Sequence, residues 1–207
     1  MKLIPGFLAA AATCLFVPPL FAGDVKPPCC RALASRVPLT ERSLYQLESK
    51  WTSDVGREVR LGVFRGHLQV VAMFFTTCES TCPIIVDDMK QIEKGLPEAL
   101  RGQVDFLLVS FDSERDTPAV LHAYREKMHL PAEHWTLLRG ATDDVRELAA
   151  LLGANFQKDA RGQFMHSNLI TLLNAEGEVA HQQTGVRGDT SGTIQALERA
   201  AQKAQPR

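Results

Sequence analysis

Short apolar runs alternate with amphipathic segments along most of the chain. QVVAMFF (69–75) and VDFLLVSF (104–111) are almost wholly apolar and rich in β-branched and aromatic residues, as strands buried on both faces are. Between them, apolar residues recur every three to four positions, which predicts a helix over 82–96. Pro83 suits the first turn of that helix, where its missing N–H costs nothing. The pattern therefore begins with a strand–helix–strand unit.

The alternation continues toward the C-terminus and includes a hairpin. Further segments are predicted as a strand over 58–64, an edge strand over 134–140, helices over 117–128, 143–152 and 190–203, and a hairpin of 167–174 with 178–185. This order predicts an α/β fold, a thioredoxin-like three-layer sandwich. Its central mixed β-sheet would be flanked by helices, with right-handed parallel crossovers and one antiparallel edge.

The first residues have the pattern of an export signal. Lys2 is followed by an apolar stretch that carries no charge before Asp24, and small residues surround Ala22. We expect a signal peptide or membrane anchor over 1–22, a proline-containing linker over 23–40 and a single domain over 41–207. The protein is then exported, either periplasmic or anchored to the outer face of the inner membrane.

Composition narrows the function classes. The formal net charge is −1 with the signs mixed along the chain, so no basic surface for nucleic acid is predicted. With 45% hydrophobic residues, a domain of this size can build a core without disulfides. The cysteines therefore call for another explanation: Cys14 in the leader, Cys29 and Cys30 in the linker, and Cys78 and Cys82 in the domain.

The segment FFTTCESTCP (74–83) contains two cysteines that could bind a metal ion or undergo redox chemistry. Cys78 and Cys82 are four residues apart at a predicted helix start, so both sulfur atoms lie on one face, and the helix N-terminus favours thiolates. Two thiolates suit a soft ion such as copper. The spacing differs from the C-x-x-C of disulfide exchange, although a redox couple stays open. A purely structural disulfide would close too short a loop to add much stability.

A third ligand must come from a distant part of the chain. Five of the six histidines are predicted to be solvated: His67, His122, His129, His134 and His181. His166 instead leads into a predicted strand from a loop that would pack against the two cysteines, so it is the candidate imidazole ligand. If the strand has begun there, Met165 should face away from His166 and pack; if it has not, Met165 could be a weak soft ligand.

Three blocks of sequence resemble one known family. FFTTCESTCP, LVSFDSERDTP (108–118) and MHSNLITLLNAEGEV (165–179) are similar, in this order, to the Sco (SenC) proteins. These are membrane-associated or exported thioredoxin-like copper proteins that assist assembly of the dinuclear copper centre of cytochrome c oxidase. The resemblance covers about residues 55–200.

The resemblance implies specific roles for residues. Cys78, Cys82 and His166 would ligate a copper ion, Cu(I) or Cu(II), and Asp112 would lie near that site. On sequence grounds alone, Asp112 and Asp116 fit the capping of a strand end and a helix start. The family commonly has a valine–aspartate pair before the histidine, where this chain has Phe164 and Met165.

Two function classes remain open. The first is a metallochaperone without turnover that delivers copper to a partner, such as a cytochrome c oxidase subunit, with Cys78 the ligand that detaches more easily. The second is a thiol–disulfide reductase in which Cys78 attacks and Cys82 resolves, acting on cysteines of a partner's copper site. Cys29 and Cys30 have no assigned role in either class.

Overall fold

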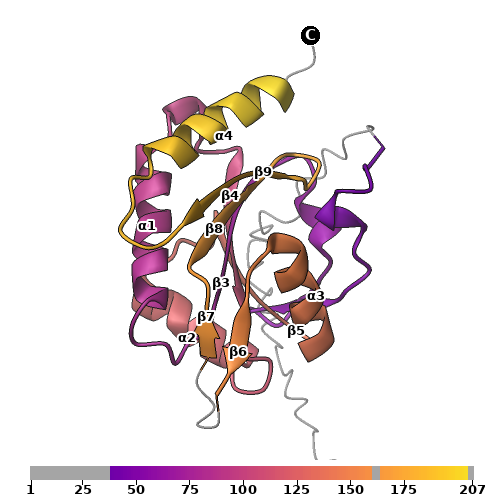
Figure 1. Cartoon of the computed structure of the whole chain (residues 1–207), viewed down its shortest axis with the longest axis vertical. Helices are drawn as coiled ribbons and strands as arrows, with labels where there is room; N and C mark the ends of the chain where they lie inside the picture. Colours follow the sequence, from indigo (N-terminus) through magenta and orange to yellow (C-terminus); the bar gives the residue numbers. More distant parts are fainter. Residues whose placement is uncertain (1–37, 160–163, 205–207) are drawn as a thin grey trace, which may run out of the picture.

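The computed structural model describes residues 38–159 and 164–204. A seven-stranded sheet in the order β2-β1-β5-β4-β3-β8-β9 forms the centre, and β6 and β7 form a separate two-stranded hairpin (Figure 1). The strands are β1 (Trp51–Ser53), β2 (Glu58–Val59), β3 (Leu68–Phe74), β4 (Val104–Ser110), β5 (Trp135–Gly140), β6 (Phe156–Lys158), β7 (Phe164–His166), β8 (Leu169–Leu173) and β9 (Val179–Thr184).

The middle of the sheet is parallel and its edges are antiparallel. β4 pairs in parallel with β3 and β5, whereas β8 runs antiparallel to β3 and β1 antiparallel to β5. Every residue of β3 is buried, as the apolar run predicts. The predicted mixed sheet is confirmed, but both edges are antiparallel rather than one.

Helices cover both faces of the sheet. They are α1 (Cys82–Gly95), α2 (Pro118–Met128), α3 (Thr142–Leu152) and α4 (Ser191–Ala204). Figure 1 shows α1 and α3 on opposite sides of the strands. On the α1 face, Phe106 stacks on Trp135, whose indole N–H donates to Glu93 of α1 at 3.1 Å. On the other face, Leu107 lies near Leu148 of α3, because successive strand residues point to opposite sides.

The helix starts follow the sequence signals. Thr117 caps α2 by accepting the Val120 N–H at 3.4 Å, and Pro118 follows it. α1 begins at Cys82 after Thr81, with Pro83 in its first turn. The three-layer sandwich predicted from the alternation of elements is therefore confirmed.

Two predicted strands are corrected. In the segment 58–64, only Glu58–Val59 is a strand, and Leu61–Phe64 forms a 3-10 helix whose buried Leu61 and Phe64 are three residues apart. The segment 134–140 is not an edge, because β1 (Trp51–Ser53) pairs with β5 on its outer side.

Several predictions fall outside the described part of the chain. The leader over 1–22 and residues 23–37 of the predicted linker, including Cys29 and Cys30, lie there. Among residues 38–159 and 164–204, no helix combines the length and apolar character that a membrane span requires.

Candidate metal centre

Three predicted site residues converge at the end of the sheet where α1 begins. The sulfur atoms of Cys78 and Cys82 and a ring nitrogen of His166 all lie within 4.8 Å of one another. Cys78 lies in the loop after β3, Cys82 is the first residue of α1, and His166 is the last residue of β7. The two cysteines are not joined in a disulfide. Such a cluster of soft donors can hold a transition-metal ion or undergo thiol–disulfide chemistry.

The loop folds so that the sulfur of Cys78 faces the end of α1. The Cys78 N–H donates to the Phe75 carbonyl at 3.2 Å, which turns the chain back toward the helix. The Cys82 N–H then donates to the Cys78 sulfur at 3.4 Å. Thr81, the residue before the helix, makes no side-chain cap, so the sulfur of Cys78 accepts a hydrogen bond from the otherwise uncapped first turn.

These contacts give the two thiols different acidities. Burial acts to raise the pKa of Cys78, but hydrogen bonds from Cys82 and Ser80 outweigh it and lower the pKa from 9.0 to about 6. Burial raises the pKa of Cys82 well above its ordinary value, and the neighbouring Cys78 adds to this. The expectation that the helix N-terminus favours both thiolates is therefore wrong for Cys82, which has no exposed surface. The hydrogen bonds in the loop therefore favour the thiolate at Cys78, whereas burial favours the thiol at Cys82.

The imidazole of His166 is held in one orientation. Its Nδ1 lies 3.1 Å from the Ser167 carbonyl, and its Nε2 lies 3.4 Å from the Cys82 sulfur. Because a carbonyl oxygen only accepts, Nδ1 carries the proton in this contact. Nε2 then presents its lone pair on the side of the cysteines, as a ligating imidazole requires.

An aromatic cluster packs against His166 and positions it beside the cysteines. The ring of His166 lies 5.3 Å from Phe111 and 5.9 Å, edge-on, from Phe75, measured between centroids. Phe111 follows β4 and Phe75 follows β3. Phe156, which pairs with His166 across the β6–β7 hairpin, packs 4.6 Å from Phe111. The hairpin is thus fastened by its phenylalanines to the ends of the two central strands.

Asp112 lies beside this cluster and is held by its own neighbour. Its side chain is buried, forms an ion pair with the Arg115 guanidinium and accepts the Arg115 N–H at 3.2 Å. It also lines a cavity of about 600 Å³ that shares Phe111 with the aromatic cluster. Asp112 is not among the three groups whose ligand atoms converge.

Sequence reasoning missed the aspartate that touches the cysteine loop. Asp116 has no exposed surface and accepts hydrogen bonds from the Thr76 N–H at 3.1 Å and the Thr76 hydroxyl at 2.5 Å. It also accepts from the Ser110 hydroxyl. Asp116 therefore does not cap α2, a role that Thr117 fills. In the sequence, Asp116 stands immediately before Thr117 and Pro118, at the start of a predicted helix. That position suggests a helix cap and not a contact with the cysteine loop.

Two further expectations are corrected. Met165 faces away from His166 as expected for a strand, but its side chain is 69% exposed and does not pack. His67 is not solvated, because its side chain is only 17% exposed and its Nδ1 lies 3.2 Å from Asp105. His122 is 52% exposed, as predicted.

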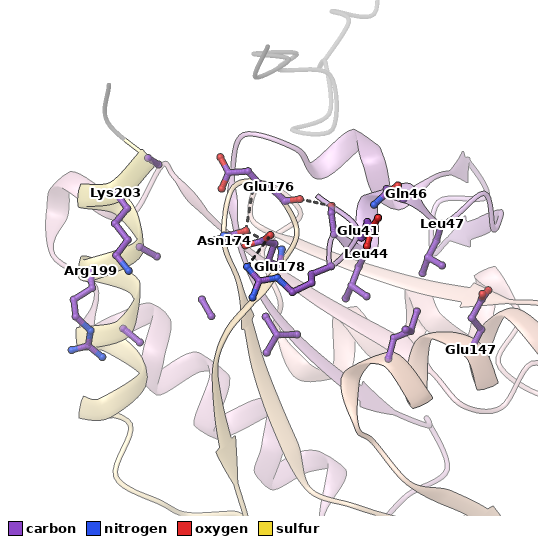
Figure 2. Close-up of a pocket in the computed structure, with 18 residues that line it drawn as sticks. Glu41, Leu44, Gln46, Leu47, Glu147, Asn174, Glu176, Glu178, Arg199 and Lys203 are labelled. Carbon is purple, nitrogen blue, oxygen red and sulfur yellow. Dashed lines mark hydrogen bonds and ion pairs between the residues drawn. The ribbon is translucent and has the colours of Figure 1, made fainter. Parts of the chain in front are cut away.

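Another cavity lies away from the cysteines, at the turn between β8 and β9. It has a volume of about 940 Å³ and is lined by the β8–β9 turn, one side of α4 and part of α3. Figure 2 shows Arg199 and Lys203 of α4 on one side of it and Glu147 on the other. None of its lining residues is a cysteine or a histidine, so the cavity does not share the donor chemistry of the cysteine–histidine cluster.

Known proteins share this sequence pattern and architecture. The SCO1/SenC family profile matches residues 39–202. A SCO1 protein homolog of Bacillus subtilis (strain 168) is 26% identical over 136 residues, which make up 63% of this chain and 69% of the relative.

Solved structures share the fold. A SCO1/SenC family lipoprotein of Bacillus anthracis superposes with a TM-score of 0.68 at 23% identity, covering 79% of this chain and 99% of that one. ScoI of Arabidopsis thaliana, solved with copper bound, superposes with a TM-score of 0.63 at 18% identity, covering 75% and 96%. The fold is therefore the thioredoxin-like one that the sequence predicts. With the match over 39–202, the chain belongs to the SCO1/SenC family.

Proposed function

We propose that this protein binds one copper ion through Cys78 Sγ, Cys82 Sγ and His166 Nε2 and passes it to a copper-dependent partner protein. The observation that carries the proposal is the convergence of these three donor atoms within 4.8 Å. Two sulfurs and an imidazole form a donor set that suits copper. Asp112, buried beside the aromatic cluster, is proposed as a nearby supporting residue rather than a ligand.

The geometry supports release as well as binding. Cys78 lies on a loop and His166 on a short hairpin, whereas Cys82 is completely buried at the start of α1. Ligand exchange with a partner's cysteines and histidines would therefore begin at Cys78 and His166. Family membership makes a cytochrome c oxidase subunit the first acceptor to test.

The proposed location follows from the N-terminal pattern. Residues 1–22 would direct export or anchor the chain, so the domain would work in the periplasm or at the outer face of the inner membrane. The similarly folded Bacillus anthracis protein is a lipoprotein, which is compatible with this placement.

The test is copper stoichiometry and the ultraviolet–visible spectrum of the reduced domain. We expect one equivalent of copper with a sulfur-to-copper charge-transfer band for wild type, and loss of tight binding for His166→Ala. His122→Ala is the matched control, because His122 is an exposed histidine on α2. Equal copper retention by His166→Ala and His122→Ala would refute the three-ligand site.

The acidities of the cysteines favour a second candidate function, thiol–disulfide exchange. The Cys78 thiolate would attack a partner's disulfide, forming a mixed disulfide and releasing one partner thiolate. Cys82 would then lose its proton and attack the Cys78 sulfur, which yields the Cys78–Cys82 disulfide and releases the second partner thiol. This reaction needs no histidine. Exchange activity that survives in His166→Ala, with no copper bound by wild type, would favour this function.

A further inference from the structure

A buried carboxylate touches the loop that carries Cys78. The side chain of Asp116 is fully enclosed and accepts three hydrogen bonds. Two come from Thr76, two residues before Cys78, and one comes from Ser110, the last residue of β4. Asp116 therefore joins the end of β4 and the start of α2 to the cysteine loop.

The partners of Asp116 do not cancel its charge. An amide and two hydroxyls are neutral donors, and Asp116 forms no ion pair within the part of the chain that the structure describes. Asp112, four residues earlier, differs in this respect because the Arg115 guanidinium neutralises it. Charge that is buried and only hydrogen-bonded acts over a longer range than a screened surface charge.

The charge of Asp116 reaches the cysteines. Thr76, to which Asp116 is joined by two hydrogen bonds, lies two residues before Cys78, and the Cys78 sulfur accepts the Cys82 N–H. The pKa of the buried Tyr124 is raised, mainly by burial, with contributions from Cys82, Cys78 and Asp116. Tyr124, Asp116 and the two cysteines thus share one poorly solvated region.

We infer that Asp116 is a positioning residue that braces the Cys78 loop and supplies a fixed negative charge, which favours the more oxidised state of the site. For the bare cysteines, this means the Cys78–Cys82 disulfide over the reduced pair, because the carboxylate opposes negative charge on sulfur. For a bound ion, it means Cu(II) over Cu(I), since the ion with the higher charge gains more from the carboxylate. The second part rests on the proposed copper function, and the first does not.

The first arm of the test uses the metal-free domain. The disulfide form of wild type, Asp116→Asn and Asp112→Asn is equilibrated with mixtures of reduced and oxidised dithiothreitol at fixed pH. In this reaction the disulfide accepts two electrons from dithiothreitol and its S–S bond breaks. We expect Asp116→Asn to shift the equilibrium toward the reduced pair by roughly tenfold. Asp112→Asn should shift it much less, because the Asp112 side chain bonds to Arg115 rather than to the cysteine loop.

The second arm compares copper affinities of the same variants with chelator competition. Asp116→Asn should weaken Cu(II) binding more than Cu(I) binding, whereas a purely bracing role would weaken both equally. Thr76→Val removes one of the braces without changing charge, so it should leave the ratio of the two affinities unchanged.

The outcomes separate the two proposals. If Asp116→Asn alters the disulfide equilibrium but no variant binds copper, the effect of the Asp116 charge on the cysteines is supported and the proposed copper function is overturned. An equilibrium in Asp116→Asn that matches Asp112→Asn overturns the role of Asp116, whatever the copper result.

Discussion

The backbone N–H of Cys82 points at the sulfur of Cys78, with nitrogen and sulfur 3.4 Å apart. The first amide of α1 thus stabilises negative charge on the preceding cysteine, while Cys82 itself is buried and stays protonated. Two chemically identical side chains, four residues apart, acquire different protonation states from their places at one helix start.

The first prediction concerns the reactivity of Cys78. Because its pKa is about 6, the thiolate predominates at pH 7, and iodoacetamide should modify Cys78 many times faster than Cys82. The rate should fall to half near pH 6, measured by mass spectrometry of the reduced, metal-free Cys82→Ser variant. The Cys78→Ser variant is the control and should react slowly throughout. A midpoint near pH 9 for Cys78 would contradict the hydrogen bonding seen in the loop.

The same pKa shift predicts a dependence of stability on pH. The pKa of Cys78 is lower in the folded protein, about 6, than its ordinary value of 9.0. Its contribution is therefore complete above pH 9 and is lost as the pH falls toward 6. The free energy of unfolding of the reduced, metal-free protein should rise more between pH 6 and 8 for wild type than for Cys78→Ala. Urea denaturation at each pH gives this comparison, and parallel curves for the two proteins would refute it.

The aromatic cluster should control copper binding without contributing a ligand. Phe111 is buried and lies 5.3 Å from the His166 ring, so Phe111→Ala should cost about 3 kcal/mol of stability and also loosen His166. Copper affinity, measured by competition, should fall with it. Phe106→Ala is the control because Phe106 is equally buried but stacks on Trp135. If both variants lose copper equally, general destabilisation rather than the position of His166 is responsible.

A buried ion pair outside the cysteine–histidine cluster should matter for stability alone. The Arg125 guanidinium of α2 donates to both oxygens of Asp54 at 2.6 and 2.8 Å, and both residues are buried. Arg125→Ala removes both hydrogen bonds and leaves Asp54 facing the exposed His122 at 3.7 Å, so it should cost about 3 kcal/mol in denaturant unfolding. Lys50→Ala breaks an exposed pair with Glu58 and should cost less than about 1 kcal/mol. Similar losses of stability in the two variants would show that burial does not determine how much the Asp54–Arg125 pair contributes to the free energy of unfolding.

Sequence patterns predicted secondary structure best in elements that are buried on one face or on both faces. The almost wholly apolar β3 and the helical spacing of Ile85, Met89 and Ile92 lead to the correct elements, and all three of these side chains are buried. Position within those elements was also enough to single out Cys78 and Cys82. The cysteines are local to one helix start, so their relationship can be read from their spacing.

Features set by distant pairing were not readable in this way. β1 has three residues and no distinctive period, so nothing marked β5 as an interior strand. Leu61 and Phe64 suit a strand end or a 3-10 turn equally well, and only packing decides between them. The role of Asp116 depends on Thr76, 40 residues away, and a buried hydrogen bond of this kind leaves no local pattern.

The unequal protonation of the two cysteines has a consequence for loading and unloading of the proposed site. The lowered pKa of Cys78 favours its thiolate, whereas the raised pKa of Cys82 means that its sulfur has to give up a proton before it can bind an ion. Uptake of each copper ion should therefore release about one proton to the surrounding water. Acidification then has the opposite effect, because it returns the proton to Cys82 and weakens binding of the ion.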